Sequence, residues 1–123
     1  MTITTPSNPL PKRGDVVLVL FPHSDLRTAK PRPALIVQAD ELKTDLPQII
    51  VAMITSKIFR ANHPSRVLVK IDSTAGKKSG LLADSVVMTD NLATITHIAI
   101  DRTIGVVPMG KINKALKHTL GLK

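Results

Sequence analysis

The chain has 123 residues, and its 17 lysines and arginines against nine acidic residues give a formal net charge of +8 at pH 7. One domain fits this length, and the charge favours a nucleic acid or an acidic protein as partner over a basic surface without one. The lack of cysteine excludes disulfides, thiolate chemistry and cysteine-based metal sites, and no apolar run approaches the roughly 18 residues of a membrane helix.

The N-terminal segment MTITTPSNPLPK has neither the basic start nor the apolar stretch of a secretory signal. Its threonine, serine, asparagine and proline content predicts a disordered tail over residues 1–11, followed by one domain over residues 12–123. Because neither a signal nor a membrane segment is evident, we expect a cytoplasmic protein.

Short apolar runs bounded by turn residues are typical of buried strands. Such runs occur at residues 15–21, 34–38, 48–55, 66–71, 80–88 and 102–107, and a further apolar stretch follows His97. Seven short strands at this density predict a small, strongly bent sheet or barrel.

The C-terminal segment predicts one amphipathic helix that packs on this sheet. Apolar or small residues recur at helical spacing, while lysines fall on the other face and Gly121 provides a stop. The apolar face comprises Ile112, Ala115, Leu116, Thr119 and Leu120, and the lysines are Lys111, Lys114 and Lys117. The predicted class is therefore mainly β with an amphipathic C-terminal helix.

Aromatic residues are nearly absent, since the chain has no tryptophan or tyrosine and only Phe21 and Phe59 carry aromatic rings. Proteins that bind single strands by stacking use several exposed rings. We therefore expect any RNA to be held by arginine, lysine, hydroxyls and backbone amides.

The segment FPHSDLRTAKPRPALIV, residues 21–37, places a proline-rich loop of mixed charge between two apolar runs. Pro31 and Pro33 favour an extended backbone at Arg32, and Lys30 adds charge beside it. The forked donors of a guanidinium suit phosphate oxygens. We interpret Arg32 as a phosphate-binding residue, with a plain solvated arginine as the alternative.

Two polar segments stand at the ends of apolar runs. Thr55, Ser56 and Lys57 could hold a phosphate or a ribose hydroxyl, or they could begin a turn that caps a short helix over KIFRA. Asp90 in the segment TDN could act as a general base, but from the residues alone a turn is the favoured interpretation.

The four histidines, His23, His63, His97 and His118, lack metal-ligand spacing, and only His23 lies in the candidate loop. A metal or histidine-pair mechanism is therefore not expected, and no cofactor is implied.

Several sequence blocks together resemble the PemK/MazF family, the toxins of bacterial type II toxin–antitoxin pairs. In order they are RGDVVLVLFP, KPRPALIV, VAMITSK, GLLADSVV and an IG before a terminal helix ending in LGL, and they extend from about Lys12 to Leu122. The resemblance implies a small SH3-like barrel, usually a homodimer, that cleaves single-stranded mRNA without a metal ion. The ribose 2′-hydroxyl would be the nucleophile. The partner would be an antitoxin whose acidic segment covers the RNA site.

The resemblance also implies roles for particular residues. Arg32 matches the arginine of the family's R-P motif, and Thr55 matches the threonine that helps hold the scissile phosphate. Asp90 and Asn91 fall where the family often has an acid followed by glutamine. Supporting residues would be His23 and Asp25, and contacts to the RNA backbone would come from Lys30, Ser56 and Lys57, with the loop 22–32 as a mobile wall of the cleft.

The sequence departs from the family pattern at a few positions. Met88 and Ala93 supply no charge where some members carry an arginine, and Val17-Leu18 stands where members often carry an aromatic residue. These changes bear on RNA sequence preference and on the strength of cleavage. The alternative function is a non-catalytic basic barrel that binds RNA or an acidic protein, and duplex DNA is disfavoured because no helix has residues suited to a groove.

Overall fold

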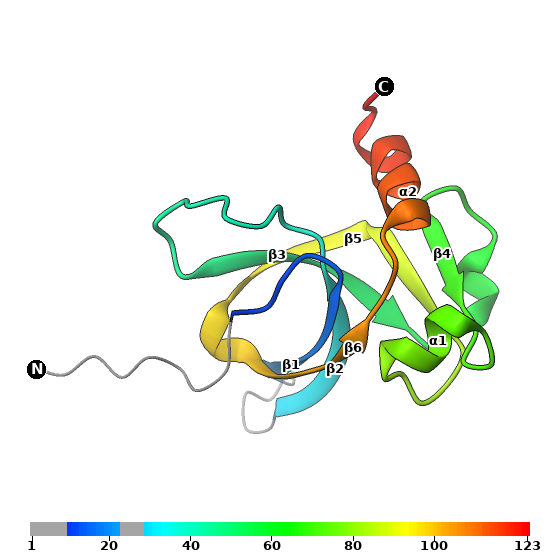
Figure 1. Ribbon diagram of the computed structural model, residues 1–123, viewed down its shortest axis with the longest axis horizontal. Helices are drawn as coiled ribbons and strands as arrows, with labels where there is room; N and C mark the ends of the chain where they lie inside the picture. The colour runs from blue at the N-terminus through cyan, green and yellow to red at the C-terminus, as the bar shows by residue number, and fades with distance from the viewer. Residues whose placement is uncertain (1–9, 23–28) are drawn as a thin grey trace, which may run out of the picture.

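The computed structural model describes residues 10–22 and 29–123, and it confirms a mainly β fold with a C-terminal helix (Figure 1). Six strands form one antiparallel sheet in the order β4-β5-β3-β2-β1-β6. The strands are β1 (Asp15–Pro22), β2 (Ala29–Ile36), β3 (Gln48–Thr55), β4 (Arg66–Val69), β5 (Ser85–Thr96) and β6 (Ile100–Val106). The helices are α1 (Thr74–Ser79), α2 (Gly110–Leu120) and the 3-10 turns η1 (Ile58–Ala61) and η2 (His97–Ala99).

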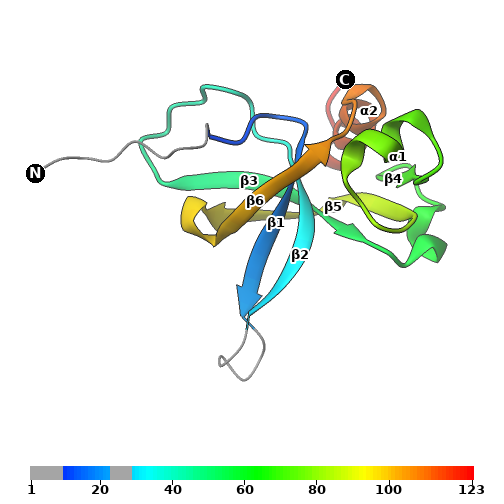
Figure 2. The same cartoon turned by 60° about the horizontal axis from the view of Figure 1, so that its bottom comes forward.

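The sheet is strongly bent, and both of its faces are buried (Figure 2). Successive residues of β3 alternate between two apolar clusters: Val51 packs in one with Val19 and Ile36, whereas Ala52 packs in the other with Leu35 and Ile112. A strand buried on both faces has a nearly continuous apolar sequence, as the run QIIVAMIT does.

Helix α2 forms as expected. Ile112 and Ala115 are buried, the three lysines are exposed, and Gly121 ends the helix with a left-handed backbone, φ 68°. Leu120 is the exception, because its side chain is 54 % exposed. Within the described part of the chain, no helix is long and apolar enough to cross a membrane.

Three strand predictions are wrong in extent, and the number of predicted strands is one too many for the described residues. The strand predicted over residues 66–71 ends at Val69, as β4. The apolar stretch after His97 is not a separate strand, because it forms η2 and then enters β6. Residues 80–84 form a loop, because Gly80 ends α1 with φ +74° and its missing Cβ would lie 2.0 Å from the Ile104 carbonyl oxygen. Strand β2 begins earlier than expected, at Ala29, so Arg32 lies within a strand.

Two expectations fall on residues outside the described ranges. The predicted tail over residues 1–11 falls mostly there, since the description begins at residue 10. The loop 22–32 is described only at its two ends, and His23 and Asp25 lie in the part that is not described.

Candidate active site

The site is built where β2 separates from β3. The two strands pair from Ile36, opposite Val51, to Ala34, opposite Met53. The backbone of the odd-numbered residues of this segment faces β3, as the hydrogen bond from Val37 N to Ile50 O shows. Pro33 is the next residue with that orientation, and it has no N–H to donate, so the ladder ends there.

The end of this ladder places Arg32 and Thr55 together. Continuing the observed register past Ala34 and Met53 would set Arg32 opposite Thr55, but the strands have already diverged. A cleft of about 720 Å³ lies between them, and both residues line it. Arg32 and Thr55, which the sequence singles out on independent grounds, therefore line the same cavity.

The cleft is strongly basic. Its walls come from β2, the end of β3, η1, the loop after α1, β5 and β6, together with Leu18 of β1. Among the residues that the structure describes, five cationic residues line it and no acidic one does; the cations are Lys30, Arg32, Lys57, Arg60 and Arg102. A concave surface with one sign of charge concentrates ions of the other sign, here the phosphates of a nucleic acid.

The Thr55–Lys57 segment forms the turn that its sequence suggested, but not the cap of the helix that follows. The Lys57 backbone N–H donates to Thr55 Oγ1 at 3.2 Å, which makes a tight turn into η1. The Thr55 hydroxyl remains able to donate its own hydrogen, and Ser56 and Lys57 also line the cleft. No side chain caps η1, so the expected helix cap is absent.

The TDN segment is a bulge inside β5 and not the turn that its composition favoured. Met88 pairs with Met53 and Leu92 pairs with Ala52, so three residues of β5 have no partner on β3. They are Thr89, Asp90 and Asn91. Bulges of this kind redirect side chains, and here Asn91 lines the cleft whereas Asp90 does not.

Asp90 instead pairs with Arg66 of β4. Arg66 Nη2 lies 2.8 Å from Asp90 Oδ2, and the Asp90 side chain is 30 % exposed. The hydrogen bond from Arg66 lowers the pKa of Asp90 below its usual value of 3.8, against a smaller opposing effect of burial. A carboxylate with a lowered pKa accepts a proton poorly at neutral pH, so the general-base interpretation of Asp90 is disfavoured.

Two of the five cations were not anticipated. Arg60 comes from η1, and Arg102 comes from β6, where it pairs with Leu18, which in turn pairs with Pro33 on β2. This register brings Arg102 to the cleft across two strands. Its guanidinium also lies 2.6 Å from Asp101 Oδ2 in an exposed ion pair. Nothing in the local sequence distinguishes either arginine from a solvated charge.

The three family departures fall in different places, and Leu18 of the pair Val17-Leu18 lines the cleft. Met88 lines the cleft, and its Sδ lies 3.8 Å from Arg60 Nη1. Ala93 packs against the apolar cluster that contains Val51, outside the cleft lining. The missing charge therefore affects the cleft only at Met88.

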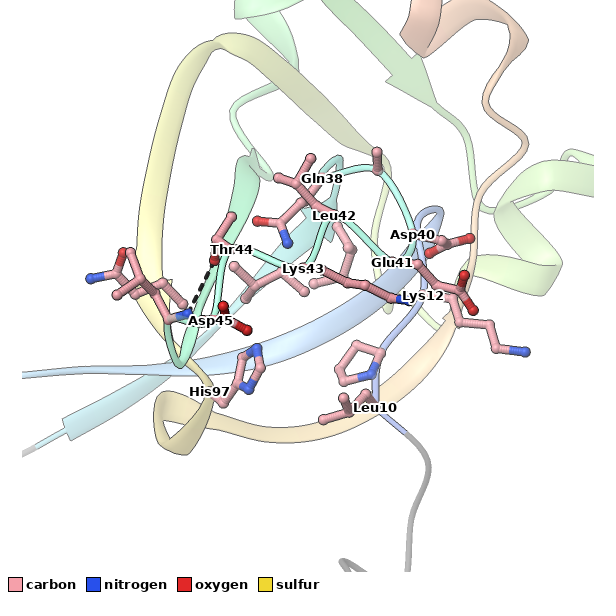
Figure 3. Close-up of a pocket in the computed structure, with 16 residues that line it drawn as sticks. Leu10, Lys12, Gln38, Asp40, Glu41, Leu42, Lys43, Thr44, Asp45 and His97 are labelled. Atoms are coloured by element: carbon pink, nitrogen blue, oxygen red, sulfur yellow. Dashed lines mark hydrogen bonds between the residues drawn. The ribbon is translucent and has the colours of Figure 1, made fainter.

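A second cavity of about 740 Å³ lies beneath the segment between β2 and β3 (Figure 3). Its lining combines Lys12 and Lys43 with three acidic residues, Asp40, Glu41 and Asp45, beside His97. A mixed lining of this kind does not concentrate phosphates, so the basic cleft is the better nucleic-acid site. Across residues 10–22 and 29–123, no three histidine or acidic side chains gather as metal ligands would.

Comparison with known proteins agrees with this geometry. Residues 12–120 match the sequence model of the PemK-like, MazF-like toxins of type II toxin–antitoxin systems. The chain is 33 % identical over 115 residues to endoribonuclease EndoA of Bacillus subtilis, covering 90 % of this chain and 95 % of that protein. The chain belongs to the PemK/MazF toxin family. As a PemK/MazF protein it is a toxin with endoribonuclease activity.

Solved structures similar to this PemK/MazF chain share its fold. An endoribonuclease from a mycobacterial species matches with a TM-score of 0.67 at 26 % identity, covering 93 % of this chain and 94 % of that chain. A mycobacterial endoribonuclease in complex with its cognate antitoxin matches with a TM-score of 0.70 at 24 % identity, covering 92 % of this chain and 97 % of that chain. The expected PemK/MazF barrel is thus confirmed.

Proposed function

We propose that this chain cleaves single-stranded RNA in the basic cleft between β2 and β3, without a metal ion. The observation that supports this most directly is that Arg32 and Thr55 line one cleft, whose described lining has five cationic residues and no acidic one. Single-stranded mRNA in the cytoplasm is the proposed substrate, and its cleavage would inhibit translation and growth.

The reaction needs no nucleophile from the protein. The ribose 2′-oxygen forms a bond to the neighbouring phosphorus and releases its proton, while the bond from phosphorus to the 5′-oxygen breaks and that oxygen takes up a proton. The products are a cyclic phosphate and a 5′-hydroxyl. The protein must hold the three reacting atoms in line and stabilise the charge that develops on the phosphorane.

We assign these tasks to the cleft residues. Arg32 stabilises the phosphorane electrostatically, because a guanidinium stays protonated at any pH at which the protein works. Thr55 donates its hydroxyl to a non-bridging oxygen, and Lys30, Ser56 and Lys57 contact neighbouring phosphates. Asn91, which the β5 bulge directs into the cleft, supplies a further donor.

The proposed partners follow from the same surface. The described lining of this cleft has cationic residues and no acidic one, so it is complementary to an acidic peptide, and a structural relative is found in complex with its cognate antitoxin. We infer that an antitoxin with an acidic segment covers this cleft and competes with RNA. We also propose a homodimer, as the family resemblance implies.

The test is cleavage of a long single-stranded RNA by the purified protein in the presence of EDTA, comparing wild type with Arg32→Ala. We expect discrete fragments with cyclic phosphate ends from the wild type and a loss of about 10²–10³ in rate for the variant. Because Arg32 is exposed, the variant should fold, which circular dichroism checks. Undiminished cleavage by folded Arg32→Ala would refute the site, and binding without any wild-type cleavage would favour a non-catalytic RNA-binding barrel.

A further inference from the structure

Phe59 is an exposed aromatic ring beside the basic cleft. It lies in η1, two residues after Lys57, and 77 % of its surface is exposed. Its neighbours Lys57 and Arg60 both line the cleft. The chain on either side of Phe59 therefore borders the cleft, and a nucleic acid bound by these two cations would pass close to η1.

Arg60 connects the ring to the cleft. Its guanidinium carbon lies 5.8 Å from the centre of the Phe59 ring, within the range of a cation–π contact. The same guanidinium contacts Met88 Sδ at 3.8 Å and lines the cleft wall. A strand whose phosphate is bound by Arg60 would have its next base within reach of Phe59.

The turn that holds Phe59 is fixed by a chain of hydrogen bonds. The Arg60 backbone N–H donates to Lys57 O at 3.0 Å, and Arg66 Nη1 donates to Arg60 O at 3.3 Å. Arg66 is in turn held by Asp90. An aromatic ring on a backbone held by hydrogen bonds loses little conformational entropy on binding, which favours it as a recognition surface.

We propose that Phe59, with the guanidinium of Arg60, forms a stacking platform for one unpaired base of the RNA, next to the phosphates held in the cleft. Every base has a π face, and alanine substitution of such rings weakens binding without a strict sequence requirement. Such a platform would add one stacked base to the arginine, lysine, hydroxyl and backbone amide contacts that the sequence predicts. Asp90 and Arg66 are positioning residues for the platform. The inference rests on the proposed function.

The test combines a protein variant with an abasic nucleotide. The probe is a fluorescent single-stranded 2′-O-methyl oligonucleotide of about nine nucleotides, within the site sizes of such proteins, whose blocked 2′-oxygen prevents cleavage. One abasic position is moved along the probe, and affinity is measured by anisotropy. For wild type we expect one position at which loss of the base weakens binding about 5- to 100-fold. Phe59→Ala should bind the probe that has all its bases with an affinity lowered by the same factor. In this variant, an abasic nucleotide at that position should weaken binding no further.

The control variants isolate the aromatic face. Phe59→Tyr should retain the wild-type pattern, whereas Phe59→Leu should lose it despite keeping an apolar side chain. Ile98→Ala removes an apolar side chain that is 89 % exposed on η2, outside the cleft lining, and should change nothing. The salt dependence of binding should stay the same in Phe59→Ala, because no phosphate contact is removed.

The outcomes separate this inference from the function on which it rests. If wild type cleaves RNA in an Arg32-dependent manner but Phe59→Ala retains full affinity and the abasic effect, the platform is refuted and the cleft is not. The exposed ring of Phe59 would then be available to contact a protein partner. If wild type binds no oligonucleotide, the proposed function and the platform fail together.

Discussion

Asp90 shows how a single residue can match a motif and still serve another purpose. Its sequence position agrees with an acid that the family resemblance places near the reaction. In the structure its carboxylate pairs with Arg66 at 2.8 Å and does not line the cleft. The neighbouring Asn91 lines the cleft instead, at the bulge where residues 89–91 of β5 leave the pairing with β3.

We expect Asp90→Asn to change the cleavage rate by less than about threefold, against the 10²–10⁴-fold loss typical of a missing general acid or base. The amide oxygen can still accept from Arg66, so the turn stays in place. The measurement is kcat/KM on a short fluorogenic RNA as a function of pH. A loss of two orders of magnitude, or a vanished limb of the pH profile, would restore Asp90 to the chemistry.

The same pair gives a prediction for stability. The pKa of Asp90 is lowered in the folded state by the hydrogen bond from Arg66, so the pair stabilises the fold above the unfolded-state pKa. This contribution is lost as the pH falls through the folded-state pKa, below 3.8. Because the pair is partly exposed, the free energy of unfolding of wild type should exceed that of Asp90→Asn by no more than about 1 kcal/mol at neutral pH. Urea unfolding of both proteins at several pH values checks this. A difference in free energy of unfolding that grows as the pH falls would contradict the prediction.

At the level of elements, close backbone contacts hold α1 against β6. A Cβ at Gly105 of β6 would lie 2.3 Å from the Ser79 carbonyl carbon and 2.4 Å from the Lys78 carbonyl oxygen. The loop that leaves α1 contributes Leu81, Leu82 and Ala83 to the cleft. The packing of α1 therefore sets the position of one cleft wall.

We expect Gly105→Ala to destabilise the protein by about 1–3 kcal/mol, because backbone atoms must shift to admit the methyl group. The measurement is the midpoint of urea unfolding at constant m-value. Gly110→Ala is the matched control, since nothing lies within 4 Å of its Cβ position at the start of α2. That variant should be unchanged or more stable by up to about 1 kcal/mol. Equal midpoints for the two variants would refute the close contact.

Sequence reasoning recovered those elements whose pattern is local. The apolar run of β3 and the helical spacing of α2 specify each element without reference to its neighbours. Residues 80–84 differ from the prediction because Gly80 lies so close to the Ile104 carbonyl that no Cβ would fit, and Ile104 is distant in sequence. Arg60 and Arg102 were missed for the same reason, since pairing across β6, β1 and β2 brings Arg102 to the cleft. Arg32 was found because adjacent prolines marked it.

At the scale of the whole molecule, the net charge of +8 is not evenly spread. In the described part of the chain the cleft has five cationic residues and no acidic one, whereas the cavity beneath the segment between β2 and β3 mixes both signs. The groove between α2 and β4 is lined by Arg66, Lys70, Lys111 and Lys114, and Arg66 is paired with Asp90. Overall charge therefore attracts RNA from a distance, but the cleft should provide the contacts that displace counterions.

The salt dependence of RNA binding distinguishes these two contributions. For a single strand, the logarithm of the binding constant falls with the logarithm of salt concentration by about 0.7 for each phosphate contact, so five contacts give a slope of about −3.5. Lys57→Ala removes one cleft cation and should make the slope shallower by about 0.7, with a similar loss of affinity for every RNA sequence. Lys114→Ala removes the same charge outside the cleft and should leave the slope unchanged. Titrations of an uncleavable 2′-O-methyl oligonucleotide over a range of salt concentrations measure both. Equal changes in slope for the two variants would mean that RNA responds to the net charge of the molecule, and that the cleft is not where its phosphates bind.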